Sequence, residues 1–258
     1  MINCISKIKE QSFLFSELVK RDFKKKYKRT YLGMLWSLFS PLLTLLIMSL
    51  IFTSFFGRSQ PHYTIYVFSG NIVFSYFTDS TGGGMGALLG NSEIFSKINL
   101  PKYLFLFSRN ISSLINFVLT FLVYLLFCVI DGIVPALSFI SLIIPILCLV
   151  IFNLGMGLIL SALFVFFRDM QYLWSVFTTL LMYMSAIFYT VDNFPVEAQK
   201  LFLLNPVYVY ISYFRIAVID GVFPSLEINL VAIGYALLTF GIGAMIYKKY
   251  NHRFIYYV

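Results

Sequence analysis

The densest group of ionisable side chains in the sequence is a basic cluster near its start. Seven lysines and arginines lie between positions 20 and 29, among them Lys24, Lys25, Lys26, Lys28 and Arg29. Such a cluster can bind nucleic acid, act as a targeting signal or lie on an anionic membrane. Residues 33–57 carry no ionisable side chain, and a helix of that length would be about 37 Å long, enough to cross a bilayer. We therefore expect an uncleaved membrane span with its basic side in the cytoplasm.

Groups that could perform catalysis or bind a metal are few and scattered. The sequence has no G-x-x-x-x-G-K-[ST] phosphate loop, and His62 and His252 lie at opposite ends of the expected fold. We expect no metal site, no bound cofactor and no catalytic residue in this chain. The cysteines show no metal or redox spacing and are expected to be packing residues: Cys4, Cys128 and Cys148.

Two polar features lie inside one apolar stretch. The glycine-rich run STGGGMG at 80–86 lacks the strand-then-helix context of a phosphate cradle, so close helix packing or a kink explains it better. Asp79 is the one acidic residue well within an apolar stretch, and a charge in that place points to function. The alternative is a carboxylate near cytoplasmic water that Ser80 or Thr81 satisfies. The sequence leaves both explanations of Asp79 open.

The composition places these groups in a membrane protein. Apolar residues make up 60% of the chain and charged residues only 12%, whereas soluble proteins average about 25% charged residues. The net charge of +8 would favour nucleic acid in a soluble domain. Nine of the 19 basic residues, however, precede residue 30, which fits a membrane surface better. We therefore expect an all-α integral membrane protein that binds no nucleic acid.

Six apolar stretches are expected to be transmembrane helices, which together make residues 33–258 one six-span domain. They cover about 33–57, 63–89, 104–130, 136–166, 170–190 and 228–247. With the N-terminus inside, 16 of the 19 basic residues lie on the cytoplasmic side, as the positive-inside rule requires. Both termini are therefore expected in the cytoplasm.

The segment 201–219 is apolar enough to be a seventh span. Against this, Asn205-Pro206 breaks the helix near its start, and Arg215 would cost about 2.5–3.5 kcal/mol at the bilayer centre. A seventh crossing would also place the basic C-terminal tail outside. We expect short re-entrant helices between the fifth and sixth spans, which dip into the outer leaflet and return.

The first 32 residues have an apolar stripe of their own. Phe15, Val19, Phe23, Tyr27 and Tyr31 recur every four residues, with basic residues between them. This spacing predicts an amphipathic helix over 1–32 that lies in the cytoplasmic membrane interface. The alternative is a solvated charge run that only fixes the topology.

Aromatic residues are unusually frequent. The chain has 29 phenylalanines and 18 tyrosines, more than two interfacial belts require. Aromatic faces inside a pore would suit a long chain of sugars, and Tyr183, Phe188 and Tyr189 are candidates for such a path. Most of the other rings are expected to face lipid or neighbouring helices.

Several segments resemble ABC-2 type permeases that export polysaccharides. The stretch ELVKRDFKKKYKRTYLGMLWSLFSPLLTLLIMSLIF resembles the N-terminal motif of that family. The residues that match the motif are Arg21, Asp22, Tyr27, Thr30, Leu32, Gly33, Trp36 and Pro41. Residues 91–109 resemble the family's coupling-helix loop, Arg168-Asp169 its second cytoplasmic contact, and 203–224 its outer-leaflet segment. One departure is Ala186, which stands where the family usually has proline. This leaves a kink at that position in question and slightly favours a capsule exporter.

The resemblance implies a pore made by two copies of this chain above two copies of a separate ATPase, which binds ATP and Mg. The residues implied to contact that ATPase are Asn91, Ser92, Glu93, Lys97, Pro101, Lys102, Arg168 and Asp169. Lysines of the interfacial helix would attract the pyrophosphate of an undecaprenyl-pyrophosphate-linked or other lipid-linked polysaccharide. Asn205, Pro206 and Arg215 would belong to a gate in the outer leaflet. The chain would then be a non-enzymatic exporter of O-antigen, capsule or teichoic acid in the bacterial inner membrane.

Two other functions compete with polysaccharide export. A drug or lipid exporter of the same fold often carries a larger extracytoplasmic domain, whereas the outer loop here has only about 37 residues. An intramembrane glycan- or lipid-modifying enzyme would need paired carboxylates at the membrane surface. The acidic residues of that region form no convincing pair: Asp192, Glu197, Asp220 and Glu227.

Overall fold

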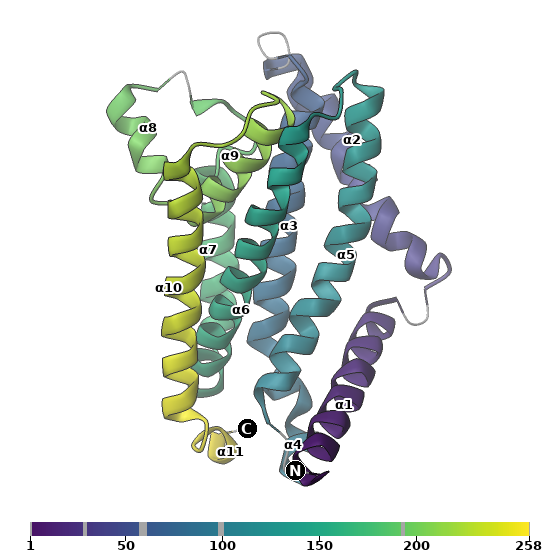
Figure 1. The fold of residues 1–258 in the computed structure, drawn as a ribbon, viewed down its shortest axis with the longest axis vertical. Coiled ribbons are helices and arrows are strands. Elements are labelled where there is room, and N and C mark those ends of the chain that lie inside the picture. Colours follow the sequence, from purple (N-terminus) through teal and green to yellow (C-terminus); the bar gives the residue numbers. More distant parts are fainter. Residues whose placement is uncertain (1, 28–29, 57–60, 98–100, 192–193, 258) are drawn as a thin grey trace.

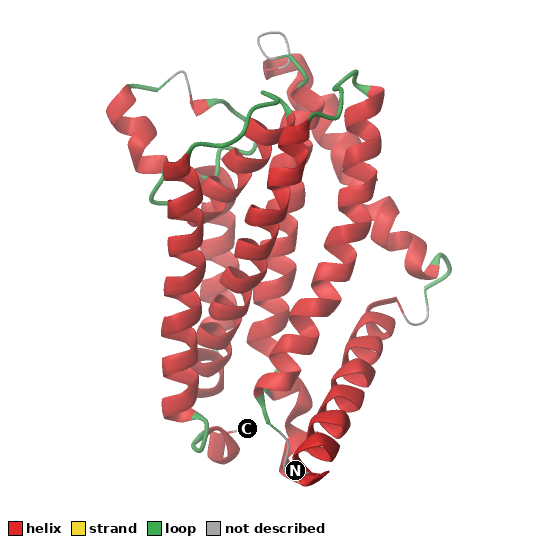
Figure 2. Cartoon of the chain, in the orientation of Figure 1, coloured by secondary structure: helices red, strands yellow, loops and turns green. Residues whose placement is uncertain are grey.

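A computed structural model of the chain describes residues 2–27, 30–56, 61–97, 101–191 and 194–257. Within these ranges helices are joined by turns and short loops, with no strand, which confirms the all-α prediction (Figure 2). The α-helices are α1 (Ile2–Tyr27), α2 (Trp36–Phe56), α3 (Tyr63–Gly86), α4 (Ser92–Lys97), α5 (Tyr103–Ile130), α6 (Ile143–Phe166), α7 (Met170–Met184), α8 (Val196–Phe202), α9 (Pro206–Val218), α10 (Leu226–Tyr250) and α11 (Phe254–Tyr257). Short 3-10 helices adjoin them: η1 (Gly33–Leu35), η2 (Leu89–Asn91) and η3 (Leu137–Leu142).

The long helices form a bundle with two distinct ends. Helices α3, α5, α6 and α10 pack side by side along its long axis (Figure 1). Both chain ends lie at the end of the bundle that carries α4 and α11, whereas α8 and α9 lie at the opposite end (Figure 1). We call these the lower and the upper end.

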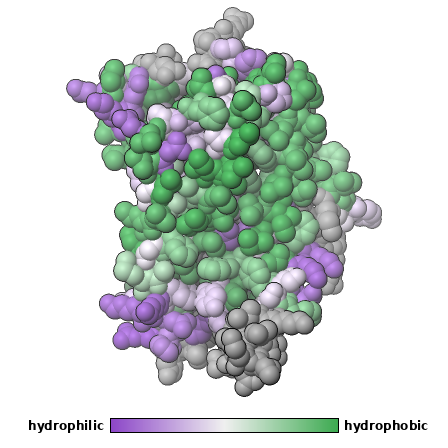
Figure 3. All heavy atoms as spheres, viewed as in Figure 1, coloured by the Kyte–Doolittle hydropathy of each residue, from purple (hydrophilic) through white to green (hydrophobic). Residues whose placement is uncertain are grey.

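Part of the bundle has the length and composition of membrane spans. Three stretches are long and apolar enough to cross a membrane: Tyr103–Ile130, Leu137–Phe166 and Leu226–Tyr250. Helices α8 and α9 pass the same test as a pair bent by 105°, which adds a fourth if they form one broken span. On the visible face, apolar side chains form a broad band around the middle and hydrophilic ones gather toward both ends (Figure 3). These features identify a membrane protein.

Helix α7 is shorter than the apolar stretch that predicted it. It ends at Met184, six residues before the expected end of the fifth span, and Ala186 adopts a left-handed conformation with φ 49°. A residue in that conformation cannot continue a right-handed helix. The chain therefore turns at Ala186 although the family's proline is missing there.

Glycines let the central helices approach closely. A Cβ on Gly84 would lie 3.1 Å from Cα of Gly157, so α3 and α6 meet backbone to backbone. A Cβ on Gly155 would lie 2.5 Å from backbone atoms of α10. The prediction of close packing in the glycine-rich run is therefore confirmed at Gly84. It does not extend to Gly82 and Gly86, where an added Cβ would meet nothing in the described chain within 4 Å.

Aromatic rings fill the core between α3, α6 and α7. The centroid of the Phe77 ring lies 5.9 Å from that of Phe152 and 5.8 Å from that of Trp174. Cys128 and Cys148 are buried free thiols. Their predicted role as packing residues is confirmed by their place in the apolar core, whereas the side chain of Cys4 lies outside the described part of the chain.

Candidate functional site

The lower end gathers most of the residues predicted to contact an ATPase. Glu93 is exposed on the short helix α4. The side-chain Nδ2 of Asn91 donates to the carbonyl of Ala87 at 2.7 Å, which stabilises the turn that leads into α4. The side chain of Lys97 lies outside the described part of the chain. Predicted contacts with at least partly exposed side chains are Asn91, Ser92, Glu93, Pro101, Arg168 and Asp169.

Lys102 differs from these residues because it is buried beneath the C-terminal segment. Its Nζ donates to the carbonyl of Asn251 at 2.6 Å and lies 5.8 Å from the centroid of the Phe254 ring. Burial lowers the pKa of Lys102. Arg168 also reaches this segment, donating from Nη2 to the carbonyl of Tyr257 at 3.2 Å. Sequence reasoning missed that the C-terminal segment joins the two predicted contact regions.

Helix α1 turns its apolar stripe toward the bundle. Leu18 is buried in a cluster that includes Phe105 of α5, whereas Lys24 and Lys25 are exposed. Phe15, Val19 and Phe23 of the predicted stripe are half-buried. This arrangement has the two faces expected of an amphipathic helix. The prediction of a helix that reaches residue 32 is wrong, because α1 is described to Tyr27, residues 30–32 are not helical and Tyr31 is exposed. Outside the described part lie the side chain of Lys26 and all of Lys28 and Arg29.

Asp22 ties α1 to α5. Its side chain is buried and accepts a hydrogen bond from Arg21 Nη2 at 2.7 Å. Its second carboxylate oxygen accepts a hydrogen bond from Ser108 Oγ on α5 at 3.1 Å. The Arg-Asp pair of the opening motif is therefore part of a contact between helices.

The predicted aromatic path residues lie in different surroundings. Tyr183 is exposed on α7, whereas Phe188 is buried in the core and its carbonyl accepts a hydrogen bond from Tyr63 at 2.9 Å. Tyr189 is half-buried and its hydroxyl donates to the carbonyl of Tyr183 at 2.7 Å. Of these three residues, Tyr183 has the most exposed ring.

The predicted gate residues form a tightly bonded corner at the upper end. Asn205 caps α9, because its Oδ1 accepts from the backbone N of Val207 at 3.0 Å. Arg215 is buried, and its Nη1 donates to the carbonyl of Ala186 at 2.9 Å. The turn after α7 thus provides a hydrogen-bond acceptor for Arg215, the residue whose charge argued against a seventh span. Pro206 is the first residue of α9, where the missing N–H costs nothing.

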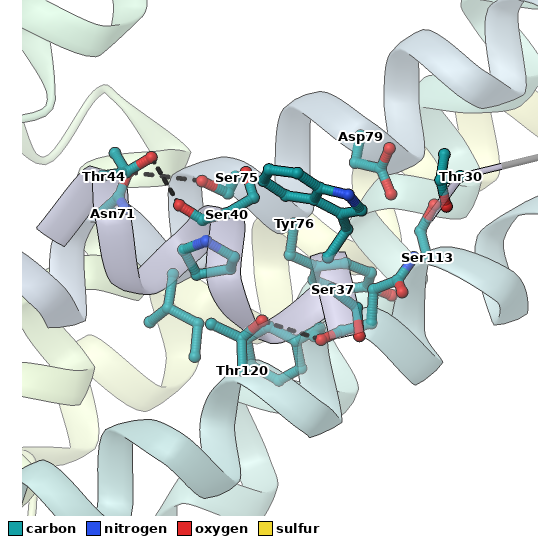
Figure 4. Close-up of a pocket in the computed structure, with 15 residues that line it drawn as sticks. Thr30, Ser37, Ser40, Thr44, Asn71, Ser75, Tyr76, Asp79, Ser113 and Thr120 are labelled. Atoms are coloured by element: carbon teal, nitrogen blue, oxygen red, sulfur yellow. Dashed lines mark hydrogen bonds between the residues drawn. The ribbon is translucent and has the colours of Figure 1, made fainter. Parts of the chain in front are cut away.

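A polar groove of about 510 Å³ lies between α2, α3 and α5 (Figure 4). Each helix contributes polar side chains that recur every three or four residues and therefore share one face. These side chains are Ser37, Ser40 and Thr44 from α2, Asn71, Ser75 and Asp79 from α3, and Ser113, Asn116 and Thr120 from α5. The ring of Trp36 also lines the groove. The groove offers many neutral hydrogen-bonding groups, one carboxylate and an aromatic face.

The groove gives a structural reason to expect a function for Asp79, because this residue lines it. It is half-buried on the groove wall, whereas Thr81 Oγ1 donates to the carbonyl of Phe77 at 2.6 Å. Ser80 Oγ accepts a hydrogen bond from Asn110 at 2.7 Å. Sequence reasoning found Asp79 but missed the groove. The signal that reveals it is the helical spacing of polar side chains within each apolar stretch.

Comparisons with known proteins agree with the predicted resemblance. The profile of the family described as ABC-2 type transporter matches residues 14–219. The chain is 30% identical to the O-antigen export system permease protein RfbA of Klebsiella pneumoniae, over 94% of this chain and 95% of that protein. It is 26% identical to the protein of the same name from Myxococcus xanthus, over 92% and 93%. It is 23% identical to the polysialic acid transport protein KpsM of Escherichia coli, again over 92% and 93%. The chain belongs to the ABC-2 type transporter family.

Proposed function

We propose that this chain is the membrane-spanning permease subunit of an ABC transporter that exports a polysaccharide, O-antigen or capsule, across the bacterial inner membrane. The names of its relatives, two O-antigen export permeases and a polysialic acid transport protein, support this proposal. The observation that carries it is the polar groove within an apolar bundle. Sugar hydroxyls lose water when they enter a membrane, and a wall of hydroxyl and amide groups replaces the lost hydrogen bonds.

The character of the groove favours a glycan over a drug or a lipid. Drug-sized ligands bind in pockets whose walls are mostly hydrophobic with a few polar groups. Here, each of three helices contributes polar side chains to the wall, beside the apolar surfaces of Trp36, Ile72 and Phe117. Many weak contacts of this kind would let a sugar chain enter and still leave, as a conducting pathway requires.

The proposed transporter contains two copies of this chain and two copies of a separate ATPase that binds ATP and Mg. The lower end would face the cytoplasm, because it holds both chain ends, α4 and Arg168 (Figure 1). Closure of the ATPase would move α4 and the adjoining bundle as a rigid body. The chain would cross the membrane six times, with α8 and α9 re-entrant in the outer leaflet. Its substrate would be linked to undecaprenyl pyrophosphate or another lipid.

Filling the groove tests the proposal. The Ser75→Phe variant places a ring at a position exposed to the groove, while Val118→Phe on α5 places one at an exposed position that does not line it. We expect Ser75→Phe to lower surface polysaccharide on the order of tenfold, the effect of a barrier raised by about 1.4 kcal/mol. Val118→Phe should export normally.

The measurement combines surface polysaccharide with the lipid-linked polysaccharide retained inside the cell. The amount of membrane-inserted protein and its co-purification with the ATPase provide the control for folding. Retention of substrate inside with normal protein levels would support the proposal. Normal surface polysaccharide in the Ser75→Phe variant would contradict it.

A further inference from the structure

A second cavity lies at the lower end, between α1, the end of α3 and α5, and it is basic. Its volume is about 410 Å³. Arg21 and Lys25 line it from α1 and Arg109 lines it from α5, with Asp22 as the one carboxylate among the lining residues. Three cations and one carboxylate leave two positive charges in excess. Such a cavity attracts an anion.

The excess charge is available because two of the cations are unengaged. Asp22 lies 2.7 Å from Nη2 of Arg21 and so compensates that guanidinium. Lys25 and Arg109 make no hydrogen bond or ion pair with any residue that the structure describes. Their N–H groups can therefore bind a ligand without breaking a contact within the protein.

Glycines form another part of the cavity wall. Gly82, Gly86 and Gly90 line the cavity at four-residue intervals, and a Cβ on any of them would meet nothing in the described chain within 4 Å. Gly83 has a different role, because its Cβ would lie 2.6 Å from Nε of Arg109. Bare backbone thus keeps the cavity open and makes room for the guanidinium of Arg109.

We propose that this basic cavity binds the pyrophosphate of the lipid-linked polysaccharide before export. The proposal rests on the proposed function and names the site that holds the head of the substrate. A pyrophosphate diester carries one negative charge on each phosphate, which matches the two uncompensated cations, whereas a common phospholipid presents a single phosphate. The planar fork of Arg109 can contact two phosphate oxygens at once.

The depth of the cavity fits a lipid head group. Arg109 lies six residues along α5 from Tyr103, the first residue of that helix, or about 9 Å along its axis. Basic pockets between helices at the cytoplasmic side of a membrane bind phosphorylated head groups. The exposed Lys24 would attract such a lipid to the surface, and the cavity would then hold its pyrophosphate.

A binding experiment with the purified full-length chain tests this site. The protein is placed in nanodiscs of neutral phosphatidylcholine, and undecaprenyl pyrophosphate, phosphatidylglycerol and inorganic pyrophosphate are titrated separately. Arg109→Gln removes a cation, and Gly86→Leu fills the cavity where no described atom stands in the way. The matched control is Gly234→Leu, an exposed position of α10 with equally open space. We expect both cavity variants to bind undecaprenyl pyrophosphate at least about tenfold more weakly, and the control to bind normally.

The outcomes separate this inference from its rivals. Unchanged binding of undecaprenyl pyrophosphate in both cavity variants would overturn it. Equal losses for phosphatidylglycerol would show a general anionic-lipid site, and equal affinity for inorganic pyrophosphate would show a site for a free anion. Unchanged lipid binding with lost ATPase co-purification would assign the cavity to the partner protein. The binding assay does not depend on export, so the Ser75→Phe variant should bind undecaprenyl pyrophosphate normally. A failure of the proposed export function would therefore appear in the export measurement and not in the binding measurement.

Discussion

Two arginines inside the bundle have opposite surroundings. Arg215, at the upper end, donates to the carbonyls of Ala186 at 2.9 Å, Ile187 at 3.1 Å and Tyr66 at 3.2 Å. Its guanidinium carbon also lies 3.4 Å from the centroid of the Tyr66 ring. Arg109, at the lower end, faces a cavity and makes no hydrogen bond to any described residue.

The difference separates a structural charge from a charge that can bind a ligand. Burying a guanidinium costs free energy unless its donors find partners, and the carbonyls around Arg215 accept from both Nη atoms, while its buried Nε has no hydrogen-bond partner among the described residues. Its bonds join α9, α3 and the turn after α7, so any movement of the predicted gate must carry these elements together or break the bonds. Arg109 makes no such bonds, and a substrate phosphate could approach it without disturbing the bundle.

The largest effect is expected from removing the structural charge. Arg215→Met leaves the carbonyl of Ile187 without its side-chain donor and removes one donor each from the carbonyls of Ala186 and Tyr66, which retain Tyr66 Oη and Ser69 Oγ. A buried polar group left unsatisfied costs about 1–3 kcal/mol. We expect a severe loss of folded protein and of thermal stability in detergent. Arg109→Gln should leave both close to the parent values, because it breaks no hydrogen bond within the described chain.

The Arg215→Lys variant provides the control for charge. A lysine keeps the positive charge but lacks the planar fork, so its stability should fall between those of the parent and Arg215→Met. The midpoint of thermal unfolding and the yield of membrane-inserted protein measure the effect. An Arg215→Met variant as stable as Arg109→Gln would remove the distinction between the two sites.

A smaller effect is expected at the turn that supplies the carbonyls. Ala186 has φ 49°, whereas proline is restricted to about −65°. Ala186→Pro would restore the family's usual residue and yet destabilise this chain by more than about 1 kcal/mol, because proline cannot adopt the positive φ of this position. Ala186→Gly should be neutral or raise stability by up to about 1 kcal/mol, because glycine adopts positive φ freely. Thermal unfolding of both variants checks this, and a stabilising proline would refute the proposed geometry.

The helices could largely be anticipated from the sequence. Long apolar stretches such as 104–130 and 228–247 correspond to α5 and α10 within a few residues, because burial in a membrane demands nearly continuous apolar composition. The end of α7 could not be anticipated. It depends on one residue, Ala186, whose left-handed backbone is held by tertiary contacts rather than by its own preference.

The sites were less predictable than the helices, because they join residues that are distant in sequence. The sequence identified Arg215 as a costly charge, but its partners are backbone carbonyls that any residue type could provide. The groove required three separate polar faces to meet, and the basic cavity required Arg21 to lie near Arg109. In each case the residue types were visible, while their juxtaposition depended on helix packing.

Lys102 offers an intermediate case at the lower end. It is a buried cation like Arg215, and its Nζ donates to the backbone carbonyl of Asn251 at 2.6 Å. Lys102→Met should release the C-terminal segment with a moderate loss of stability, about 1.5–3 kcal/mol for a hydrogen bond from a charged group. Limited proteolysis after Tyr250 measures the release. An unchanged cleavage rate would show that the aromatic contacts of Phe254 hold the segment without Lys102.

The smallest effect is expected at an ion pair that water reaches. His62 Nδ1 lies 2.7 Å from Asp131 Oδ2 at the upper end, and the two side chains are 37% and 35% exposed. Asp131→Asn removes the charge but retains the backbone N–H of residue 131, which donates to the carbonyl of Phe127 and ends α5. Because solvent screens exposed pairs, we expect thermal stability to change by less than about 1 kcal/mol. A loss of thermal stability as large as that of Arg215→Met would show that solvent exposure does not separate weak from strong polar contacts in this protein. The contrast between Arg215 and Arg109 would then need another cause.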